Sequence, residues 1–342
     1  MQEPNVQFDR RDLLTGAGPG VAGPGRKFWI GGVLRAVLVV LVLVPAAAQA
    51  SAGTWTGDPV VRTASGQVRG FLDRESTWSW KGIPDARPPV GDLRWKAPRD
   101  PLPWSGVRAA ATFGNWAPQF FPLLGFVTGS EDCLYLNVLR PVGKAAGLPV
   151  YVWIHGGGNS VGAADMVPDY YGHAVAARSD MVFVSINYRL GPLGWFYHDS
   201  LAAEADAPGA LPGDGSGNYG TLDIIRALRW VRQNAAAFGG DPDRVTIAGE
   251  SAGAMNILSL LTSPMAAGLF QRAVVQSGST RMANLEDARA ASAGLVAGLA
   301  VADRKAPDEI AAYGKLAAMP AAEHAAWLRG QSPARILSRT KG

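Results

Sequence analysis

This chain of 342 residues has little cysteine and histidine and only a small excess of positive charge. Cys133 is its only cysteine, which excludes an intrachain disulfide, and the whole chain has four histidines. The net charge is +4, but five of the Lys and Arg residues and three acids lie in the first 50 positions, which leaves +2 for the rest. So small an excess of basic over acidic side chains does not indicate a surface that binds nucleic acids, and we expect no nucleic-acid partner.

The long hydrophobic run near the N-terminus predicts an export signal over residues 1–50. Arg26, Lys27 and Arg35 lead into an apolar segment at 36–44, and the P-A-A-A-Q-A sequence that ends at Ala50 fits small-x-small cleavage. The D-R-R-D-L-L sequence at 9–14 resembles a twin-arginine motif, so the twin-arginine and general secretory routes both stay open. An uncleaved signal anchor is a further alternative. We expect an exported protein, periplasmic or secreted, that meets the membrane only through this segment.

The remainder, residues 51–342, has the pattern of one α/β domain. Apolar, β-branched runs at 148–154, 181–188, 245–248 and 272–276 predict buried strands, and long crossovers between them predict a mostly parallel sheet. Residues 60–72 predict a hairpin that turns at Ser65-Gly66, and residues 134–139 another strand. The 221–238 segment has apolar residues at helical spacing and ends at Gly239-Gly240, so we expect a helix packed on the sheet.

The sequence G-E-S-A-G at 249–253 fits the G-x-S-x-G nucleophile elbow. A strand is predicted before it and a helix over 252–261 after it, so Ser251 lies on a sharp strand-to-helix turn. Gly249 and Gly253 are small enough for the close packing that such a turn requires. We therefore predict that Ser251 is a catalytic nucleophile.

The sequence H-G-G-G at 155–158 follows the strand predicted at 148–154 and matches an oxyanion loop. Without a Cβ in the way, the N–H groups of Gly157 and Gly158 can point at a substrate oxygen. Ala252 supplies a third N–H from the start of the helix that follows the elbow. These three residues are the predicted oxyanion hole.

Five further motifs accompany these two: G-I-P-D-A-R-P-P-V-G-D-L-R-W at 82–95, E-D-C-L-Y-L-N-V at 131–138, N-Y-R-L-G-P-L-G at 187–194, G-N-Y-G at 217–220 and F-G-G-D-P at 238–242. With all seven, the chain from about Thr54 to its C-terminus resembles the type-B carboxylesterases, the esterase, lipase and cholinesterase group of α/β-hydrolases. The resemblance implies an α/β-hydrolase fold and hydrolysis of a small-molecule carboxylic ester through an acyl-serine intermediate. It implies no cofactor and no metal.

The acid and the base of a catalytic triad are not found in their expected place. In this fold they follow the serine in the order acid, then histidine. The only histidine after Ser251 is His324, in a segment whose composition predicts a short amphipathic surface helix. The acids after Ser251 read as solvated side chains: Glu286, Asp287, Asp303, Asp308, Glu309 and Glu323. We therefore expect a chain truncated before its catalytic acid and histidine, with the last part of the fold missing beyond Gly342.

Three residues depart from the pattern of the family. Ala117 stands where a partner cysteine for Cys133 is common, so we expect Cys133 to be a small buried apolar residue. Asp85 and Asn159 each replace an aromatic residue. Both are expected near the acyl and leaving-group pockets, where they would change the size and polarity of the accepted substrate.

The sequence offers two alternatives to an active esterase. The G-x-G-x-x-G sequence at 215–220 opens a helix but follows a polar loop instead of a strand, so it fails as a dinucleotide-binding motif. The second is a non-catalytic esterase-like domain that binds a ligand or partner. The missing base favours that domain, whereas the intact elbow and glycine loop favour a serine carboxylesterase.

Overall fold

The computed structural model describes residues 55–121, 124–143, 145–280 and 283–340. The described residues belong to one compact unit that spans 48–342. The expected export signal at 1–50 lies outside the described residues. Within them, no helix is long and apolar enough to cross a membrane.

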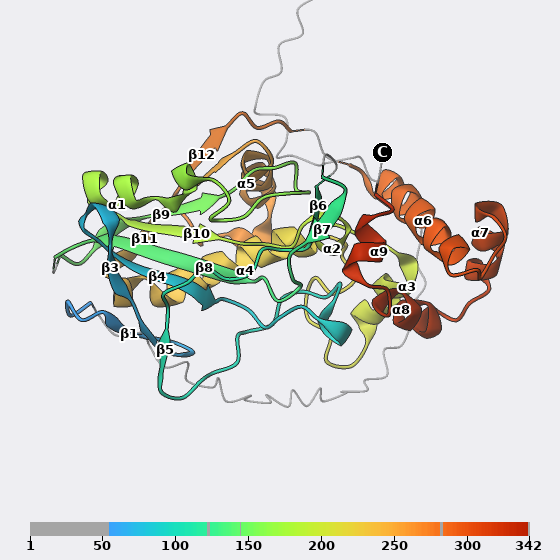
Figure 1. Ribbon diagram of the computed structural model, residues 1–342, viewed down its shortest axis with the longest axis horizontal. Helices are drawn as coiled ribbons and strands as arrows, with labels where there is room; N and C mark the ends of the chain where they lie inside the picture. The colour runs from blue at the N-terminus through green and yellow to red at the C-terminus, as the bar shows by residue number, and fades with distance from the viewer. Residues whose placement is uncertain (1–54, 122–123, 144, 281–282, 341–342) are drawn as a thin grey trace, which may run out of the picture. The chain divides into compact units, whose positions relative to one another are not determined.

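A seven-stranded sheet forms the centre of this unit (Figure 1). Its strand order is β12-β11-β9-β10-β8-β4-β3. The pairs β12/β11, β11/β9 and β9/β10 are parallel, while β10/β8, β8/β4 and β4/β3 are antiparallel. The sheet is therefore mixed, and the predicted parallel arrangement holds for the half that carries the elbow. The strands of this sheet are β3 (Phe71–Asp73), β4 (Thr77–Pro84), β8 (Tyr135–Pro141), β9 (Leu148–Ile154), β10 (Val182–Ile186), β11 (Gly240–Glu250) and β12 (Arg272–Gln276).

Two small sheets accompany the central one. The predicted N-terminal hairpin is present as β1 (Val60–Thr63) and β2 (Gly66–Arg69), which pair antiparallel and are joined by β5 (Val107–Ala109) in a three-stranded sheet. The other is a two-stranded ribbon of β6 (Gln119–Phe121) and β7 (Phe126–Thr128).

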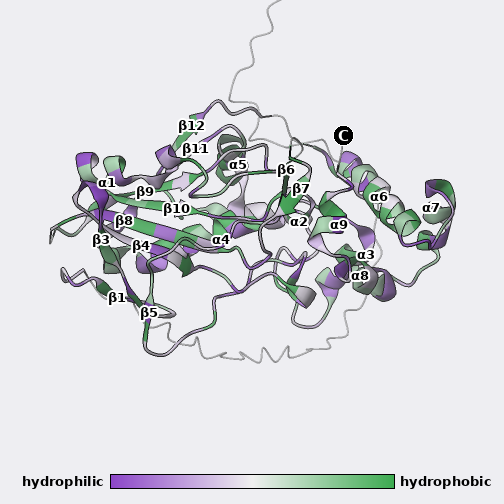
Figure 2. Ribbon diagram, viewed as in Figure 1, coloured by the Kyte–Doolittle hydropathy of each residue, from purple (hydrophilic) through white to green (hydrophobic). Residues whose placement is uncertain are grey.

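The two faces of the central sheet are covered by different helices: α1 (His173–Ser179) on one face, and α4 (Tyr219–Asn234) and α5 (Ala252–Thr262) on the other. Side chains alternate between faces along a strand. Val150, Val152 and Ile154 of β9 therefore share the main core with α4 and α5, whereas Tyr151 and Trp153 pack with the α1 cluster. Figure 2 shows hydrophobic residues along the central strands.

The helix predicted over 221–238 is present as α4 followed by a 3₁₀ turn at Ala235–Phe238. It ends at Gly239, whose φ of 79° is the left-handed conformation that glycine adopts readily. The helix predicted over 252–261 is α5. Both predictions are confirmed, because each segment is bounded by a strand and by a clear stop signal.

A second core cluster lies beyond the end of the sheet, where the C-terminal helices gather near α3 (Asp199–Ala202) (Figure 1). It joins residues of these helices to Trp95, Phe196 and Tyr219. The helices involved are α6 (Leu285–Ala302), α7 (Glu309–Ala317), α8 (Ala321–Arg329) and α9 (Pro333–Leu337), and α9 also contacts the short α2 (Gly191–Gly194).

Candidate active site

Ser251 lies between β11 and α5 in a conformation that serine rarely adopts. Its φ is 54° and its ψ is −119°. Such a backbone costs on the order of 1–3 kcal/mol and persists only where its surroundings enforce it. The neighbouring strand supplies part of that enforcement, because the Ser251 N–H donates to the Gln276 carbonyl of β12 at 2.9 Å.

The glycines on either side of Ser251 are required by close backbone packing. A Cβ on Gly249 would lie 2.7 Å from the Gly253 carbonyl carbon and 2.8 Å from the Ile154 oxygen. A Cβ on Gly253 would overlap the Ile154 carbonyl and lie 2.7 Å from the His155 oxygen. The elbow therefore packs directly on the end of β9, where the glycine loop begins.

The structure brings the predicted glycine loop beside the predicted nucleophile. A Cβ placed on Gly156 would be 3.2 Å from the Ser251 Cβ and 2.7 Å from the Glu250 oxygen. Gly157 and Gly158 have φ values of 104° and 64°, and a Cβ on Gly157 would collide with the Val161 carbonyl. The turn is closed by hydrogen bonds from Ser160 and Val161 to the Gly157 carbonyl, at 3.1 and 3.0 Å.

The N–H groups of Gly157, Gly158 and Ala252 donate no hydrogen bond to another described residue. Ala252 is the first residue of α5, where N–H groups have no partner within the helix. Free N–H groups are what an oxyanion hole requires. The assignment of these three residues as that hole remains a prediction.

His155 and Tyr188 hold the glycine loop in place. Their rings stack with centroids 4.4 Å apart, and the Tyr188 hydroxyl donates to the His155 carbonyl at 2.5 Å. Burial lowers the pKa of His155 to about 4, so its ring is neutral at pH 7. Its Nδ1 hydrogen-bonds the Gly156 carbonyl at 2.8 Å, and no hydrogen bond among the described groups links it to the Ser251 hydroxyl, so this histidine holds the loop in place.

The amphipathic surface helix predicted around His324 is present as α8, with its first three residues exposed and His324 on its buried face. His324 is 5% exposed and packs on the rings of His198 and Trp327, with centroids 4.4 and 5.7 Å away. Its Nε2 is buried without a hydrogen-bond partner among the described groups. Burial, with a smaller effect of His198, lowers the pKa of His324 to about 4. No hydrogen bond links it to Ser251.

The acids after Ser251 mostly lie on the surface, as predicted, and Asp303 is the exception. It accepts hydrogen bonds from Trp327 Nε1 at 2.8 Å and Gln331 Nε2 at 3.0 Å, and it forms an ion pair with Arg335. Asp303 thus joins α6, α8 and α9. Throughout the described residues, no carboxylate or histidine forms a hydrogen bond with the Ser251 hydroxyl, and no three potential metal ligands cluster together.

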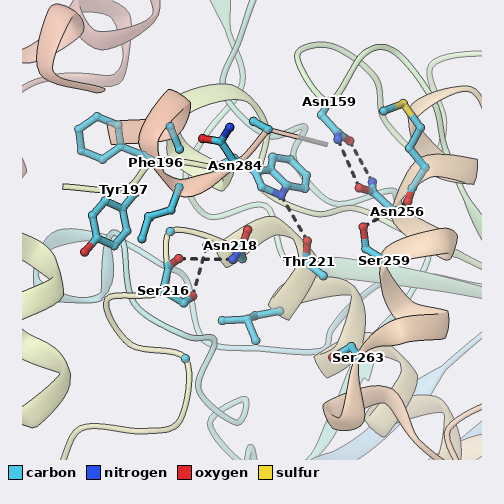
Figure 3. Close-up of a pocket in the computed structure, with 18 of the residues that line it drawn as sticks. Asn159, Phe196, Tyr197, Ser216, Asn218, Thr221, Asn256, Ser259, Ser263 and Asn284 are labelled. Atoms are coloured by element: carbon cyan, nitrogen blue, oxygen red, sulfur yellow. Dashed lines mark hydrogen bonds between the residues drawn. The ribbon is translucent and has the colours of Figure 1, made fainter. Parts of the chain in front are cut away.

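A pocket of about 760 Å³ lies along α5, and neither Ser251 nor the predicted oxyanion-hole residues are among the residues that line it (Figure 3). One wall comes from α5 and the residue after the glycine loop, where Met255, Asn256 and Asn159 lie. Gly213, Ser216 and Gly217, from the segment that precedes α4, form another part. Further walls come from the first half of α4, from the aromatic residues at 195–197 and from the start of α6.

Of the two residues expected near the pockets, only Asn159 lines this one. Asp85 is 1% exposed at the end of β4, and Arg226 Nε donates to its backbone carbonyl at 3.0 Å. Asp85 therefore does not line this pocket, and its expected place near an acyl or leaving-group pocket stays a prediction. Cys133 is fully buried in the main core, as predicted.

Comparison with known proteins gives a consistent family. The carboxylesterase family model matches residues 57–342. Para-nitrobenzyl esterase of Bacillus subtilis (strain 168) is 46% identical over 239 residues, which are 68% of this chain and 46% of that protein. Phenmedipham hydrolase of Pseudarthrobacter oxydans is 42% identical over 227 residues, 64% of this chain and 43% of that protein.

Solved structures agree with these relatives. A PNB esterase aligns with a TM-score of 0.68 and 38% identity, covering 83% of this chain and 53% of that chain. The carboxylesterase EST55 of Geobacillus stearothermophilus aligns with a TM-score of 0.66 and 37% identity, covering 82% and 54%. The structural neighbours have the α/β-hydrolase fold that the sequence predicts. The chain spans about half the length of the curated relatives it matches.

Proposed function

This chain belongs to the carboxylesterase family, and on that basis we propose that it is a serine carboxylesterase that acts through an acyl enzyme on Ser251. The observation that carries the proposal is the position of the glycine loop against the elbow, with Gly156 beside the Ser251 side chain and three unpaired N–H groups nearby. The substrate class is a small-molecule carboxylic ester.

The reaction follows from this arrangement. The Ser251 Oγ attacks the ester carbonyl carbon, and the electron pair of the C=O bond moves to oxygen. The N–H groups of Gly157, Gly158 and Ala252 stabilise that negative charge. When the tetrahedral intermediate collapses, the bond to the alkoxy group breaks, the alkoxy oxygen takes up the proton that the Ser251 hydroxyl has lost, the alcohol leaves and the acyl group stays on Ser251. Water then releases the carboxylic acid.

The described residues do not provide a group that removes the proton from the Ser251 hydroxyl. A general base must lie within hydrogen-bond reach of the serine hydroxyl, and none does so here. Loss of the base of a serine triad costs on the order of a millionfold in kcat. We therefore expect ester turnover by this chain alone to be near background.

The experiment is labelling with a fluorophosphonate, which reports on the serine without requiring turnover. We expect slow, stoichiometric modification of Ser251 in residues 51–342, and none in Ser251→Ala. Modification of another residue, or label retained in the Ser251→Ala variant, would contradict the assignment.

A second candidate is a non-catalytic esterase-like binding domain, which the missing contact between Ser251 and a base favours. It predicts no labelling at Ser251, so the same experiment separates the two.

Export remains a proposal carried by the leader sequence alone. The mature protein made in a bacterial host is expected to begin at Ser51. N-terminal sequencing of exported material tests this, and a leader retained in the membrane fraction would favour an anchor.

A further inference from the structure

Two asparagines in the pocket wall form a reciprocal amide pair. Asn256 Nδ2 donates to Asn159 Oδ1 at 2.9 Å, and Asn159 Nδ2 donates to Asn256 Oδ1 at 3.3 Å (Figure 3). Asn159 directly follows the glycine loop, and Asn256 lies on α5 five residues after Ser251. The pair therefore bridges the two segments that supply the predicted oxyanion hole.

Both amides are fixed in place before any ligand arrives. Asn256 is 4% exposed. Asn159 has a left-handed backbone with φ of 55°, and its carbonyl accepts from the Gly191 N–H at 2.6 Å. Asparagine tolerates this conformation better than most residues. Binding of a ligand would therefore cost little further conformational entropy, because both side chains are already ordered in the folded protein.

The pair leaves hydrogen-bonding capacity unused. Each side-chain amide has two N–H donors and two acceptor lone pairs, and each bond of the pair uses one donor and one acceptor. The Asn256 amide also hydrogen-bonds the Tyr188 side chain, so the N–H that remains free is that of Asn159. Because Asn159 lines the pocket, this N–H is available to a bound molecule.

The other residues of the pocket limit the charge of the molecule that can bind there. None of the described residues that line it carries a charged side chain. Its α6 wall begins with Asn284, whose side chain caps the helix by accepting from the Asp287 N–H at 2.8 Å. Glu286 and Asp287 in the first turn offset the positive end of that helix. A buried anion or cation would lack a partner here, and an unpaired buried charge is costly.

We propose that the Asn159–Asn256 pair determines substrate specificity by binding an uncharged oxygen, such as an ether, carbonyl or hydroxyl oxygen, in the part of the ester that enters this pocket. The inference rests on the proposed esterase function. The aromatic side chains of Phe196 and Tyr197, on the opposite side of the view in Figure 3, contact the apolar body of the same group. The names of the relatives point to different substrates, so family membership alone does not select this one.

The test measures the rate at which fluorophosphonates modify Ser251 in residues 51–342. Four reagents share one reactive group and one tail length, and their tails are an alkyl chain, an ether chain, a carboxylate and a trimethylammonium. We expect the ether tail to react about fivefold faster than the alkyl tail, and both charged tails to react about tenfold slower.

Two variants identify the residues responsible. Asn256→Leu should bring the ratio of ether to alkyl rates close to one. Asn256→Asp keeps an acceptor for Asn159 Nδ2 but adds a negative charge, so the trimethylammonium reagent should gain about tenfold relative to the ether reagent. Asn115→Leu is the matched control: Asn115 is an exposed asparagine outside the pocket and should leave all ratios unchanged. Thermal unfolding of each variant checks that it is folded.

The possible outcomes distinguish a failure of the proposed esterase function from a failure of the role given to the amide pair. If no reagent modifies Ser251, the proposed esterase function fails and this inference fails with it. If Ser251 reacts but the rates do not depend on the tail, or the ratios survive in a folded Asn256 variant, only the role of the amide pair is overturned.

Discussion

The backbone of Gly253, on the first turn of α5, packs against the carbonyl group of Ile154 at the end of β9. A Cβ on residue 253 would overlap that carbonyl and lie 2.7 Å from the next carbonyl oxygen, that of His155. Both neighbours are backbone atoms in the centre of the sheet, which cannot move aside as a flexible side chain can. The conformation of Ser251 thus depends on residue 253 having no side chain.

Gly253→Ala is therefore expected to destabilise the protein severely, by about 3 kcal/mol or more, or to abolish soluble expression. Gly294→Ala in α6 is the matched control. The nearest atom to a Cβ there is the Tyr313 hydroxyl at 3.9 Å, so this variant should be stabilised by about 0.5–1 kcal/mol. Urea unfolding measures both. Equal stability of the two variants would show that the elbow does not depend on this contact.

The sequence predicted the elbow, the glycine loop and the strands that carry them because each depends on residues close together in the chain. Ser251 needs Gly249 and Gly253, and the apolar runs on either side identify a strand and a helix. The Asn159–Asn256 pair could not be predicted, since its members are 97 residues apart and Asn256 belongs to no motif. The same limit applies to the burial of Asp85 and His324, which is decided by distant partners.

Asp85 provides a pH-dependent prediction. Burial raises its pKa to about 7, against the opposing effect of Arg226, and its Oδ1 has no hydrogen-bond partner among the described residues. Between pH 4 and pH 7 the unfolded chain loses this proton while the folded protein keeps it. The Asp85 contribution to stability therefore falls as pH rises through this window and is constant above it.

Asp85→Asn removes this titration. The variant should be more stable than the wild type by about 1–3 kcal/mol at pH 8, and the difference should vanish near pH 4. Chemical denaturation of both proteins at several pH values measures the difference. A gain that is independent of pH would mean that Asp85 is ionised in the folded protein.

His324 predicts the opposite pH dependence. Its pKa is lowered to about 4 in the fold, whereas an unfolded histidine titrates near pH 6.5. Stability should therefore be lost as pH falls from about 6.5 to 4, because the unfolded chain binds the proton first. His198, which faces His324, also has a lowered pKa through its burial and adds to the effect.

The variant His324→Leu should be less sensitive to acid in this range, as measured by thermal unfolding, and should still be labelled at Ser251. It also tests the catalytic alternative. Robust, saturable hydrolysis of a short-chain aryl ester by the wild type that is lost in this variant would identify His324 as the base. It would then refute the expectation of near-background turnover.

The edge strand β12 predicts self-association. All five of its residues are exposed, and it pairs on one side only, with β11, among the described strands. Val274 and Val275 are 37% and 39% exposed. An unpaired apolar edge is a template for pairing with another chain, and a lysine on such a strand opposes it.

Val275→Lys should therefore lower the fraction of oligomer and aggregate seen by analytical ultracentrifugation of residues 51–342, with a stability change within about 0.5 kcal/mol. The control is Leu261→Lys, which adds the same charge at a position on α5 that is 53% exposed and outside the sheet. If both variants reduce association equally, net charge is responsible. If only Val275→Lys does so, the association proceeds through the β12 edge, the strand that also accepts the Ser251 N–H at Gln276.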